Sequence, residues 1–298
     1  MALTRKQFDI LDIMATSDKP LTQRDIEAVS GYSLGSVNRV MKELLELGYV
    51  ENNKITGFGM DALEPYRCKR AVFIAAGFGS RMVPITFNTP KPLVRVHGVR
   101  IIDRLIDSCL EAGINEIYIV RGYLGELFDQ LLYKYPMIKF LENPVYNEAN
   151  NISSALVARY LLSNAYVFEA DLLISNPKII RKYHYSSDFL GIKKTRTDDW
   201  CVKVKDGIIV EEKVGGEGDD IWQMAGISYW NEADGHKLSQ DIQDVYNSPG
   251  GKERYWEQVP LVYCAKNYRV EIRDCKEEDI VEIDTFNELK AIDPTYNV

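Results

Sequence analysis

The sequence has 298 residues, a net charge of -8, 46% apolar residues and 27% charged residues, which is typical of a folded globular protein long enough for two domains. Its apolar stretches are shorter than the roughly 18 residues that a bilayer span needs, and charged residues near the N-terminus argue against a signal peptide, so we expect a cytoplasmic protein. Five scattered cysteines and three histidines disfavour disulfides and structural zinc, and the negative charge disfavours nucleic-acid binding over the whole surface.

The first part of the chain has the apolar periodicity of three helices, at residues 4–16, 22–29 and 33–47. Thr22, followed three residues later by Asp25, predicts a capping box at the start of the second helix. Two short extended stretches after the third helix predict a small hairpin. Residues 1–65 are therefore expected to form a small domain of their own.

This domain resembles the winged helix-turn-helix of the multiple-antibiotic-resistance regulators, through the pattern LTxRDIxxxSGxSxGSVNRxxKxLxExGYV at residues 21–50. The resemblance implies that the third helix enters a DNA major groove, with candidate contacts from Ser33, Ser36, Asn38 and Arg39. However, seven basic residues face ten acidic ones in this domain, which is a poor electrostatic footprint for DNA. DNA binding and a role in docking or homodimer formation therefore both stay open.

From residue 66 onward, expected strands alternate with expected helices. The strands are AVFIAA, EIYIVRG, IKFLENP and AYVFEAD, and the helices lie near residues 101–112, 124–134 and 152–162. Such alternation predicts an α/β domain in which helices cover both faces of a mainly parallel sheet.

A glycine-rich loop at residues 75–80 follows the first of these strands, where ligands bind in open α/β sheets. Gly77 and Gly79 would let the backbone approach a phosphate closely and point N–H groups at its oxygens. The dinucleotide fingerprint would need glycine in place of Met82, and the P-loop pattern is absent. The loop is thus a candidate phosphate site of another kind.

The continuation AAGFGSRMVPITFNTPKPLV matches the signature GxGxRxxPxTxxxPKPL almost throughout, and so resembles the nucleotidyltransferases that act on sugar phosphates and phosphocholine. The resemblance implies a Rossmann-like nucleotidyltransferase domain with a mixed, mainly parallel sheet over residues 66–298. It also implies that Arg81 holds the departing phosphates and that Lys91 bridges the phosphates of both substrates, because fixed cations offset the repulsion between two anions. The implied nucleotide-binding loop consists of Ala75, Ala76, Gly77, Gly79, Ser80 and Arg81.

Carboxylates are needed to hold Mg²⁺ on a nucleoside triphosphate. Asp171 ends a predicted strand, and Glu282 and Asp284 alternate with apolar residues in IVEIDTF, so that both face one side of a strand. Members of the resembled family carry acidic residues at matching positions. We therefore expect Asp171, Glu282 and Asp284 to bind the metal, the alternative being ordinary carboxylates at a sheet edge.

The segment YNEANNISSA contains the pattern YxxxNNxxS, which resembles bacterial CTP:phosphocholine cytidylyltransferases of the choline-incorporation (Lic) type. That resemblance implies that Asn151 and Ser154 lie near the cytosine and the ribose. The sugar enzymes carry E-K-P further on, whereas this chain has Glu212-Lys213-Val214. The acceptor is therefore expected to be a choline-like compound.

A quaternary ammonium group is recognised by aromatic faces and a nearby carboxylate. We expect Trp200, Tyr255 and Trp256 to form such a cage, with Glu257 as the carboxylate. Tyr229 and Trp230 are weaker candidates, and packing in the core is the alternative for every tryptophan.

These features predict Mg²⁺-dependent transfer of a cytidylyl group from CTP to phosphocholine, giving CDP-choline and pyrophosphate. The expected catalytic residues are Arg81, Lys91 and Asp171. Alternative acceptors are phosphoethanolamine, 2-aminoethylphosphonate or a sugar phosphate. The remaining alternative is a transcriptional regulator that senses a nucleotide or a choline metabolite.

Overall fold

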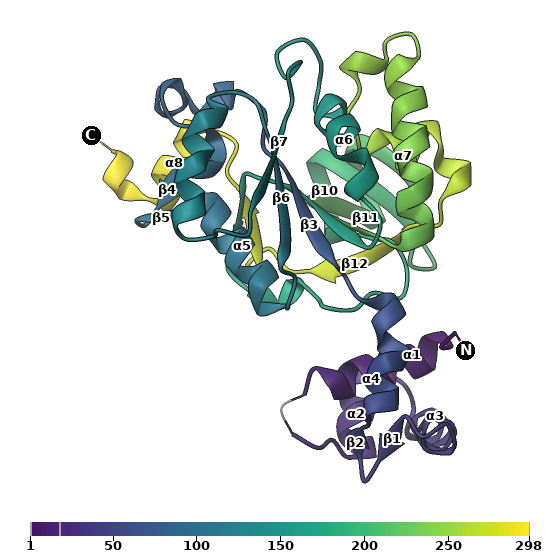
Figure 1. Ribbon diagram of the computed structural model, residues 1–298. Helices are drawn as coiled ribbons and strands as arrows, with labels where there is room; N and C mark the ends of the chain where they lie inside the picture. The colour runs from purple at the N-terminus through teal and green to yellow at the C-terminus, as the bar shows by residue number, and fades with distance from the viewer. Residues whose placement is uncertain (1, 18, 298) are drawn as a thin grey trace. The chain divides into compact units, whose positions relative to one another are not determined.

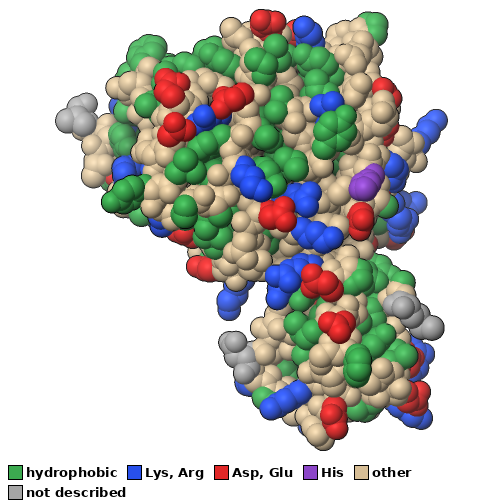
Figure 2. All heavy atoms as spheres, viewed as in Figure 1, with side chains coloured by type: hydrophobic (Ala, Val, Ile, Leu, Met, Phe, Trp, Pro, Cys, Tyr) green, Lys and Arg blue, Asp and Glu red, His purple; other side chains and the backbone are tan. Residues whose placement is uncertain are grey.

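The computed structural model describes residues 2–17 and 19–297, and the chain folds into two compact units (Figure 1). The N-terminal unit comprises Met1–Arg67 together with Tyr183–Tyr185, and the α/β unit comprises Cys68–Lys182 and Ser186–Val298. Basic and acidic side chains are interspersed on the visible face (Figure 2).

The N-terminal unit consists of four helices and a two-stranded hairpin. Its elements are α1 (Arg5–Ala15), α2 (Gln23–Ser30), α3 (Leu34–Glu46), β1 (Val50–Glu51), β2 (Lys54–Ile55) and α4 (Gly57–Leu63). The predicted capping box of Thr22 and Asp25 is present, and Gly31 ends α2 with the left-handed φ of 70° that favours glycine. Helix α4 was not expected, because Gly57 and Gly59 in its sequence are poor helix formers.

The core of the N-terminal unit includes side chains from a distant part of the sequence. Tyr183 is buried among the apolar residues of α1 and α3. Tyr185 stacks on Tyr66, with their ring centroids 5.6 Å apart, and both rings contact Phe8. Residues 183–185 are therefore structural members of this unit, although the 115 residues of Cys68–Lys182 separate them from Arg67 in the sequence.

The α/β unit is built on a seven-stranded sheet with the order β10-β12-β11-β8-β3-β6-β7. Its strands are β3 (Arg70–Ile74), β6 (Glu116–Arg121), β7 (Lys139–Glu142), β8 (Ala165–Glu169), β10 (Asp188–Lys205), β11 (Ile208–Trp230) and β12 (Glu271–Cys275). Strands β7, β6, β3 and β8 pair in parallel, whereas β11 is antiparallel to β8. The predicted mixed, mainly parallel sheet is confirmed.

Helices cover both faces of this sheet (Figure 1). Along β3, Ala71 and Phe73 belong to one apolar cluster and Val72 to the other, as the alternation of side chains in a strand requires. The first cluster contains apolar residues of α5 (Ile101–Glu111), and the second contains those of α6 (Ile152–Ala158) and α7 (Glu232–Asn247). The helix expected at 124–134 is a run of 3₁₀ turns, Gly125–Tyr133.

Two small sheets and a short helix complete the unit. One pairs β4 (Arg95–Val96) with β5 (Val99–Arg100), and the other pairs β9 (Leu172–Ile174) with β13 (Ile280–Glu282). Helix α8 (Phe286–Ile292) follows β13. Because Glu282 lies opposite Leu172, this pairing brings the C-terminal part of the chain to the end of β8. Within the described residues, no helix combines the length and the apolar character needed to cross a membrane.

Replacement of Tyr183 by alanine should destabilise the N-terminal unit by about 3 kcal/mol, because it removes a buried aromatic side chain. Hydrogen exchange followed by mass spectrometry should show faster exchange in α1 and α3. Tyr133→Ala is the matched control, because Tyr133 is fully exposed at 100%. Unchanged exchange of α1 and α3 in Tyr183→Ala would contradict this prediction.

Candidate active site

The glycine-rich loop lies at the carboxyl end of β3 and forms one wall of a cavity of about 250 Å³. Ala75, Gly77, Gly79, Ser80 and Arg81 all line this cavity. Gly79 has φ 62°, and a Cβ atom there would approach Lys91 Cβ to 3.0 Å. Glycine is therefore required for the loop to pass this close to Lys91. Ala76 is buried, and its carbonyl accepts a hydrogen bond from Tyr123 N.

Lys91 is the buried cation of the cavity. It begins a short 3₁₀ turn, Lys91–Leu93, directly after Pro90, and only 8% of the residue is exposed. Its Nζ donates to Asp171 Oδ2 at 2.8 Å and to Asp284 Oδ1 at 3.0 Å. Burial by itself lowers the pKa of Lys91, but the two carboxylates outweigh that effect and raise it. Lys91 is therefore charged, as a phosphate-binding residue must be.

Arg81 is the second cation and belongs to the more open part of the same cavity. Its Nη2 donates to Asp284 Oδ1 at 2.7 Å, while its side chain is 66% exposed. Burial would raise the pKa of Asp284, but its contacts with Lys91 and Arg81 lower it. The structure thus brings Arg81, Lys91, Asp171 and Asp284 together, although the first and last of them are 203 residues apart.

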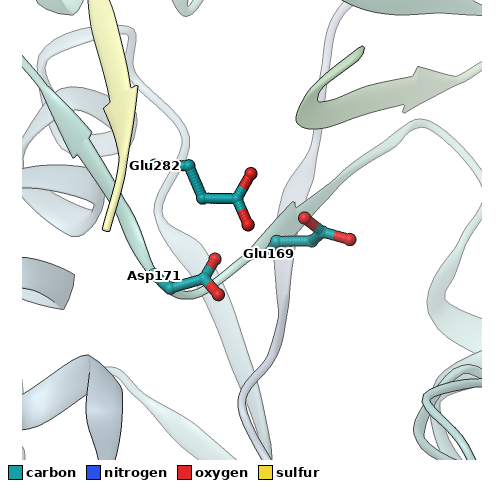
Figure 3. Close-up of side chains that lie close together, drawn as sticks. All are labelled: Glu169, Asp171 and Glu282. Atoms are coloured by element: carbon teal, nitrogen blue, oxygen red, sulfur yellow. The ribbon is translucent and has the colours of Figure 1, made fainter. Parts of the chain in front are cut away.

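Three carboxylate side chains lie close together (Figure 3). Glu169 ends β8, Asp171 precedes β9, and Glu282 ends β13. One oxygen from each lies within 4.8 Å of the others. Of the predicted metal ligands, Asp171 and Glu282 are in this cluster, whereas Asp284 contacts the two cations instead.

Glu169 was missed by the sequence analysis. Glu169 lies two residues before Asp171, in the EAD that ends the predicted strand. Because residues two positions apart in a strand face the same side, this spacing could have indicated that Glu169 lies beside Asp171. Gly226 lies beside it in β11, and a Cβ atom there would come within 2.8 Å of Glu169 Oε2. The glycine therefore makes room for this carboxyl group.

The three carboxylates fit a hard divalent cation. Among the described residues, Asp171 Oδ1 is buried and has no hydrogen-bond partner. Burial together with the neighbouring acids raises the pKa of Glu169 well above its ordinary value, and that of Glu282 to about 8. Magnesium prefers such oxygen ligands and completes its octahedron with water and phosphate oxygens.

A second cavity, of about 540 Å³, adjoins the first and shares Gly77, Ser80, Arg81, Asp171 and Asp284 with it. The rest of its wall combines carboxylates with aromatic side chains. The residues Glu169, Asp199, Trp200, Tyr255, Trp256, Glu257 and Glu282 all line it.

The aromatic part of this wall is smaller than expected. Trp200 and Tyr255 meet edge to face, with their ring centroids 5.3 Å apart. Trp256 also lines the cavity, but its ring packs against Trp230 and Phe189 and is almost completely buried. Two rings, Trp200 and Tyr255, thus remain available to a ligand.

The structure corrects the predictions for Tyr229 and Trp230. Both are buried in the core, where the Tyr229 ring packs against Tyr166 and Trp230 Nε1 donates to Ser228 Oγ. They lie at the end of β11 that pairs with the start of β8, away from the glycine-rich loop. Among the described residues next to Tyr229 and Trp230 in the sequence, Ser228 lines the second cavity and Asn231 does not.

The two residues expected near cytosine and ribose lie in different surroundings from each other. Ser154 is buried in α6, and its Oγ accepts a hydrogen bond from Asn143 Nδ2 at 3.0 Å. Asn151 lines the second cavity, where its Oδ1 accepts from Trp256 N at 2.8 Å and its Nδ2 donates to Glu257 Oε2 at 3.4 Å. The structure therefore places Asn151 beside the predicted acceptor residues and Ser154 in the core.

Comparison with known proteins agrees with this arrangement. Residues 70–176 match the Nucleotidyl transferase family, and residues 3–53 match the MarR family. The first match spans β3, the glycine-rich loop, Lys91 and Asp171.

Several characterised proteins are similar to the α/β unit. The 2-aminoethylphosphonate cytidylyltransferase of Lancefieldella rimae is 36% identical over 230 residues, which cover 76% of this chain and 92% of that protein. The choline-phosphate cytidylyltransferase of Streptococcus pneumoniae is 30% identical, covering 75% of this chain and 96% of that protein. A solved structure of CTP:phosphocholine cytidylyltransferase from Streptococcus pneumoniae superimposes with a TM-score of 0.70 at 28% identity, covering 77% of this chain and 99% of that one. The chain therefore belongs to the cytidylyltransferases of the nucleotidyl transferase family and carries, in addition, a MarR-like winged helix-turn-helix at its N-terminus.

Proposed function

We propose that this cytidylyltransferase transfers the cytidylyl group of CTP to 2-aminoethylphosphonate, with phosphocholine as the second candidate acceptor. The observation that carries the proposal is the second cavity, in which carboxylates outnumber the available aromatic faces. It adjoins the cavity that contains Arg81 and Lys91. An acceptor with an anionic head and a cationic tail would span the two.

In this reaction an acceptor oxygen forms a bond to the α-phosphorus of CTP, and the bond from that phosphorus to the bridging oxygen of the β-phosphate breaks. The electron pair of the broken bond leaves with pyrophosphate. A phosphonate or phosphate oxygen is already nucleophilic at neutral pH, so catalysis depends mainly on positioning and on charge neutralisation. The chain needs no covalent intermediate for this chemistry.

The residues of the first cavity match these needs. The backbone N–H groups of the glycine-rich loop would bind the phosphates of CTP. Arg81 would neutralise the departing pyrophosphate, and Lys91 would lie between the two reacting anions. Lys91 already shares its ammonium between Asp171 and Asp284, which fixes the position of its Nζ.

We assign Mg²⁺ as the cofactor, held by Glu169, Asp171 and Glu282, with Asp284 close by. When bound, the ion neutralises charge on the triphosphate. The cluster of oxygen donors and the buried, unpaired Asp171 Oδ1 in the described structure support this assignment.

The tail of the acceptor distinguishes the two candidates. A primary ammonium donates three hydrogen bonds and needs oxygen acceptors, whereas a quaternary ammonium donates none and relies on aromatic faces. Glu257 supplies such an acceptor in the second cavity, and burial raises the pKa of Glu257 to about 7. Either cation would favour the ionised form of Glu257, but only a primary ammonium would also donate hydrogen bonds to it.

Phosphocholine stays the second candidate because Trp200 and Tyr255 still offer two aromatic rings, inclined to each other at 61°. Both acceptors also occur among the names of the relatives, since one acts on 2-aminoethylphosphonate and another on choline phosphate. A sugar phosphate is disfavoured because Val214 replaces the proline of the E-K-P pattern and is largely exposed.

A second role, DNA binding, is proposed for the N-terminal unit because residues 3–53 match the MarR family. Ser33 caps α3, and Arg39 and Lys42 are exposed on that helix. However, each of these two cations has a glutamate within 4.0 Å one turn later on the helix. These pairs would have to be exchanged for phosphate contacts, so DNA binding through α3 is expected to be weak.

Lys91→Ala and Asp171→Asn should each lower cytidylyl transfer by about 10³-fold, because each removes a charged group that acts on the phosphates or the metal. Steady-state pyrophosphate release would measure the loss, and circular dichroism would verify the fold. Lys134→Ala is the matched control, since Lys134 pairs with Asp107 and is half exposed. Retention of more than about a tenth of the activity in Lys91→Ala would refute its assigned role.

A screen of four nucleoside triphosphates against five acceptors should identify both substrates. The acceptors are 2-aminoethylphosphonate, phosphoethanolamine, phosphocholine, glucose 1-phosphate and, as the control without an amine, ethylphosphonate. We expect CTP with 2-aminoethylphosphonate to give the highest kcat/KM, about tenfold above phosphocholine. The reverse preference would support the second candidate, and activity with the sugar phosphate alone would exclude both.

The full chain should retard DNA taken from upstream of its own coding sequence in a mobility-shift assay at low salt, and Arg39→Ala should weaken the shift, because Arg39 is an exposed cation of α3. Arg196→Ala is the control, because Arg196 is an exposed, ion-paired arginine of the α/β unit. Equal retardation of unrelated DNA, or no retardation, would argue for docking instead.

A further inference from the structure

We propose that Asn151 is a positioning residue that orients Glu257 toward the amine of the acceptor and thereby sets acceptor selectivity. The inference rests on the proposed function, because it assumes an acceptor with a cationic tail. It assigns to the second asparagine of the NN pair a role in the acceptor pocket rather than in base recognition.

The geometry of the Asn151 side chain carries the proposal. Asn151 immediately precedes α6 and projects into the second cavity. Its Oδ1 accepts from Trp256 N at 2.8 Å, and its Nδ2 donates to Glu257 Oε2 at 3.4 Å. The two ends of this amide thus contact two consecutive residues, Trp256 and Glu257, of the segment 255–257. This segment lies more than 100 residues after Asn151 in the sequence.

The neighbouring Asn150 attaches the same two parts of the chain at a second point. Its backbone N–H donates to the carbonyl of Lys252 at 2.7 Å, and its Nδ2 donates to the carbonyl of Glu253 at 3.2 Å. Its Oδ1 accepts from Asn151 N at 2.7 Å. Asn150 therefore fixes the backbone of the segment, which leaves Asn151 to contact the residues that line the cavity.

Glu257 needs such a partner because it is buried, with only 8% of the residue exposed. A buried carboxylate without a donor pays a large desolvation cost and favours its neutral form. The backbone N–H of Glu257, and after it the side-chain N–H of Asn151, act against this effect of burial on the pKa of Glu257. By binding Oε2, Asn151 also fixes the orientation of the carboxyl group toward the cavity.

The same hydrogen bonds argue against base recognition by Asn151. An asparagine reads a base through its amide oxygen and nitrogen together. Here the oxygen already accepts from Trp256 N, and the nitrogen already donates to Glu257. Binding to cytosine would have to use the second N–H and the second lone pair of the same amide, whose orientation these two contacts already fix.

Asn151→Asp tests the proposal because aspartate keeps an oxygen for Trp256 N but cannot donate to Glu257. We expect kcat/KM for 2-aminoethylphosphonate to fall about tenfold, with the KM for CTP unchanged. The preference for 2-aminoethylphosphonate over ethylphosphonate, which lacks the amine, should fall by the same factor. Asn147→Asp is the matched control, because it makes the same change at an exposed position four residues earlier.

A double-mutant cycle with Glu257→Gln separates positioning from a structural role. If Asn151 acts through Glu257, Asn151→Asp should cause little further loss of selectivity in the Glu257→Gln background. The same loss in both backgrounds would show a general structural defect and overturn the proposal. Unchanged CTP affinity serves as the evidence that the variants are folded.

The remaining outcomes separate this inference from the proposed function. If the wild-type enzyme prefers the amine-bearing acceptor and Asn151→Asp keeps that preference, the inference alone is wrong. If Asn151→Asp raises the KM for CTP and leaves acceptor selectivity intact, Asn151 serves the nucleotide and the inference is overturned. If the wild-type enzyme shows no preference for an amine, both the proposed acceptor and this inference fail.

Discussion

The active site depends on one interaction, the sharing of the Lys91 ammonium between Asp171 and Asp284. It joins the loop after β3, the turn after β8 and the segment after β13, which lie far apart in the sequence. A buried lysine is tolerated only with such partners, because desolvation of an unpaired ammonium is costly. The same pairing keeps the lysine charged and fixes its Nζ at the wall of the first cavity. The ion pairs therefore support both the fold of this region and the positive charge that phosphate chemistry requires.

The two cavities divide the work of binding according to charge. The first combines the glycine-rich loop with Arg81 and Lys91 and suits phosphates. The second combines carboxylates with the exposed rings of Trp200 and Tyr255 and suits a small cation. The cluster of Glu169, Asp171 and Glu282 lines the second cavity, with Asp171 also in the wall of the first, and its mutual repulsion favours a divalent ion. Under the proposed function, this arrangement of charges would orient a zwitterionic acceptor with its phosphorus toward the nucleotide.

Packing determined which aromatic residues are available to a ligand. Trp230, Tyr229 and most of Trp256 fill the core behind the second cavity, so they support the wall rather than contact a ligand. The tandem asparagines before α6 then attach the 252–257 segment to the start of that helix. In the N-terminal unit, Tyr183 and Tyr185 complete a core otherwise formed by the first 67 residues. Both cases use side chains distant in sequence to finish a local structure.

The sequence alone determined the features whose residues are contiguous: the three N-terminal helices, the alternation of strands and helices, the glycine-rich loop, and the roles implied for Arg81 and Lys91. Local patterns suffice there, because capping, periodicity and the motif are read from neighbouring residues. The tertiary structure decided which acidic residues meet, adding Glu169 and moving Asp284 to the cations. It also placed Asn151 in the wall of the second cavity and Ser154, Tyr229 and Trp230 in the core. Strand pairing and burial set these positions, and neither can be read from one segment, because each depends on the partner that another part of the chain supplies.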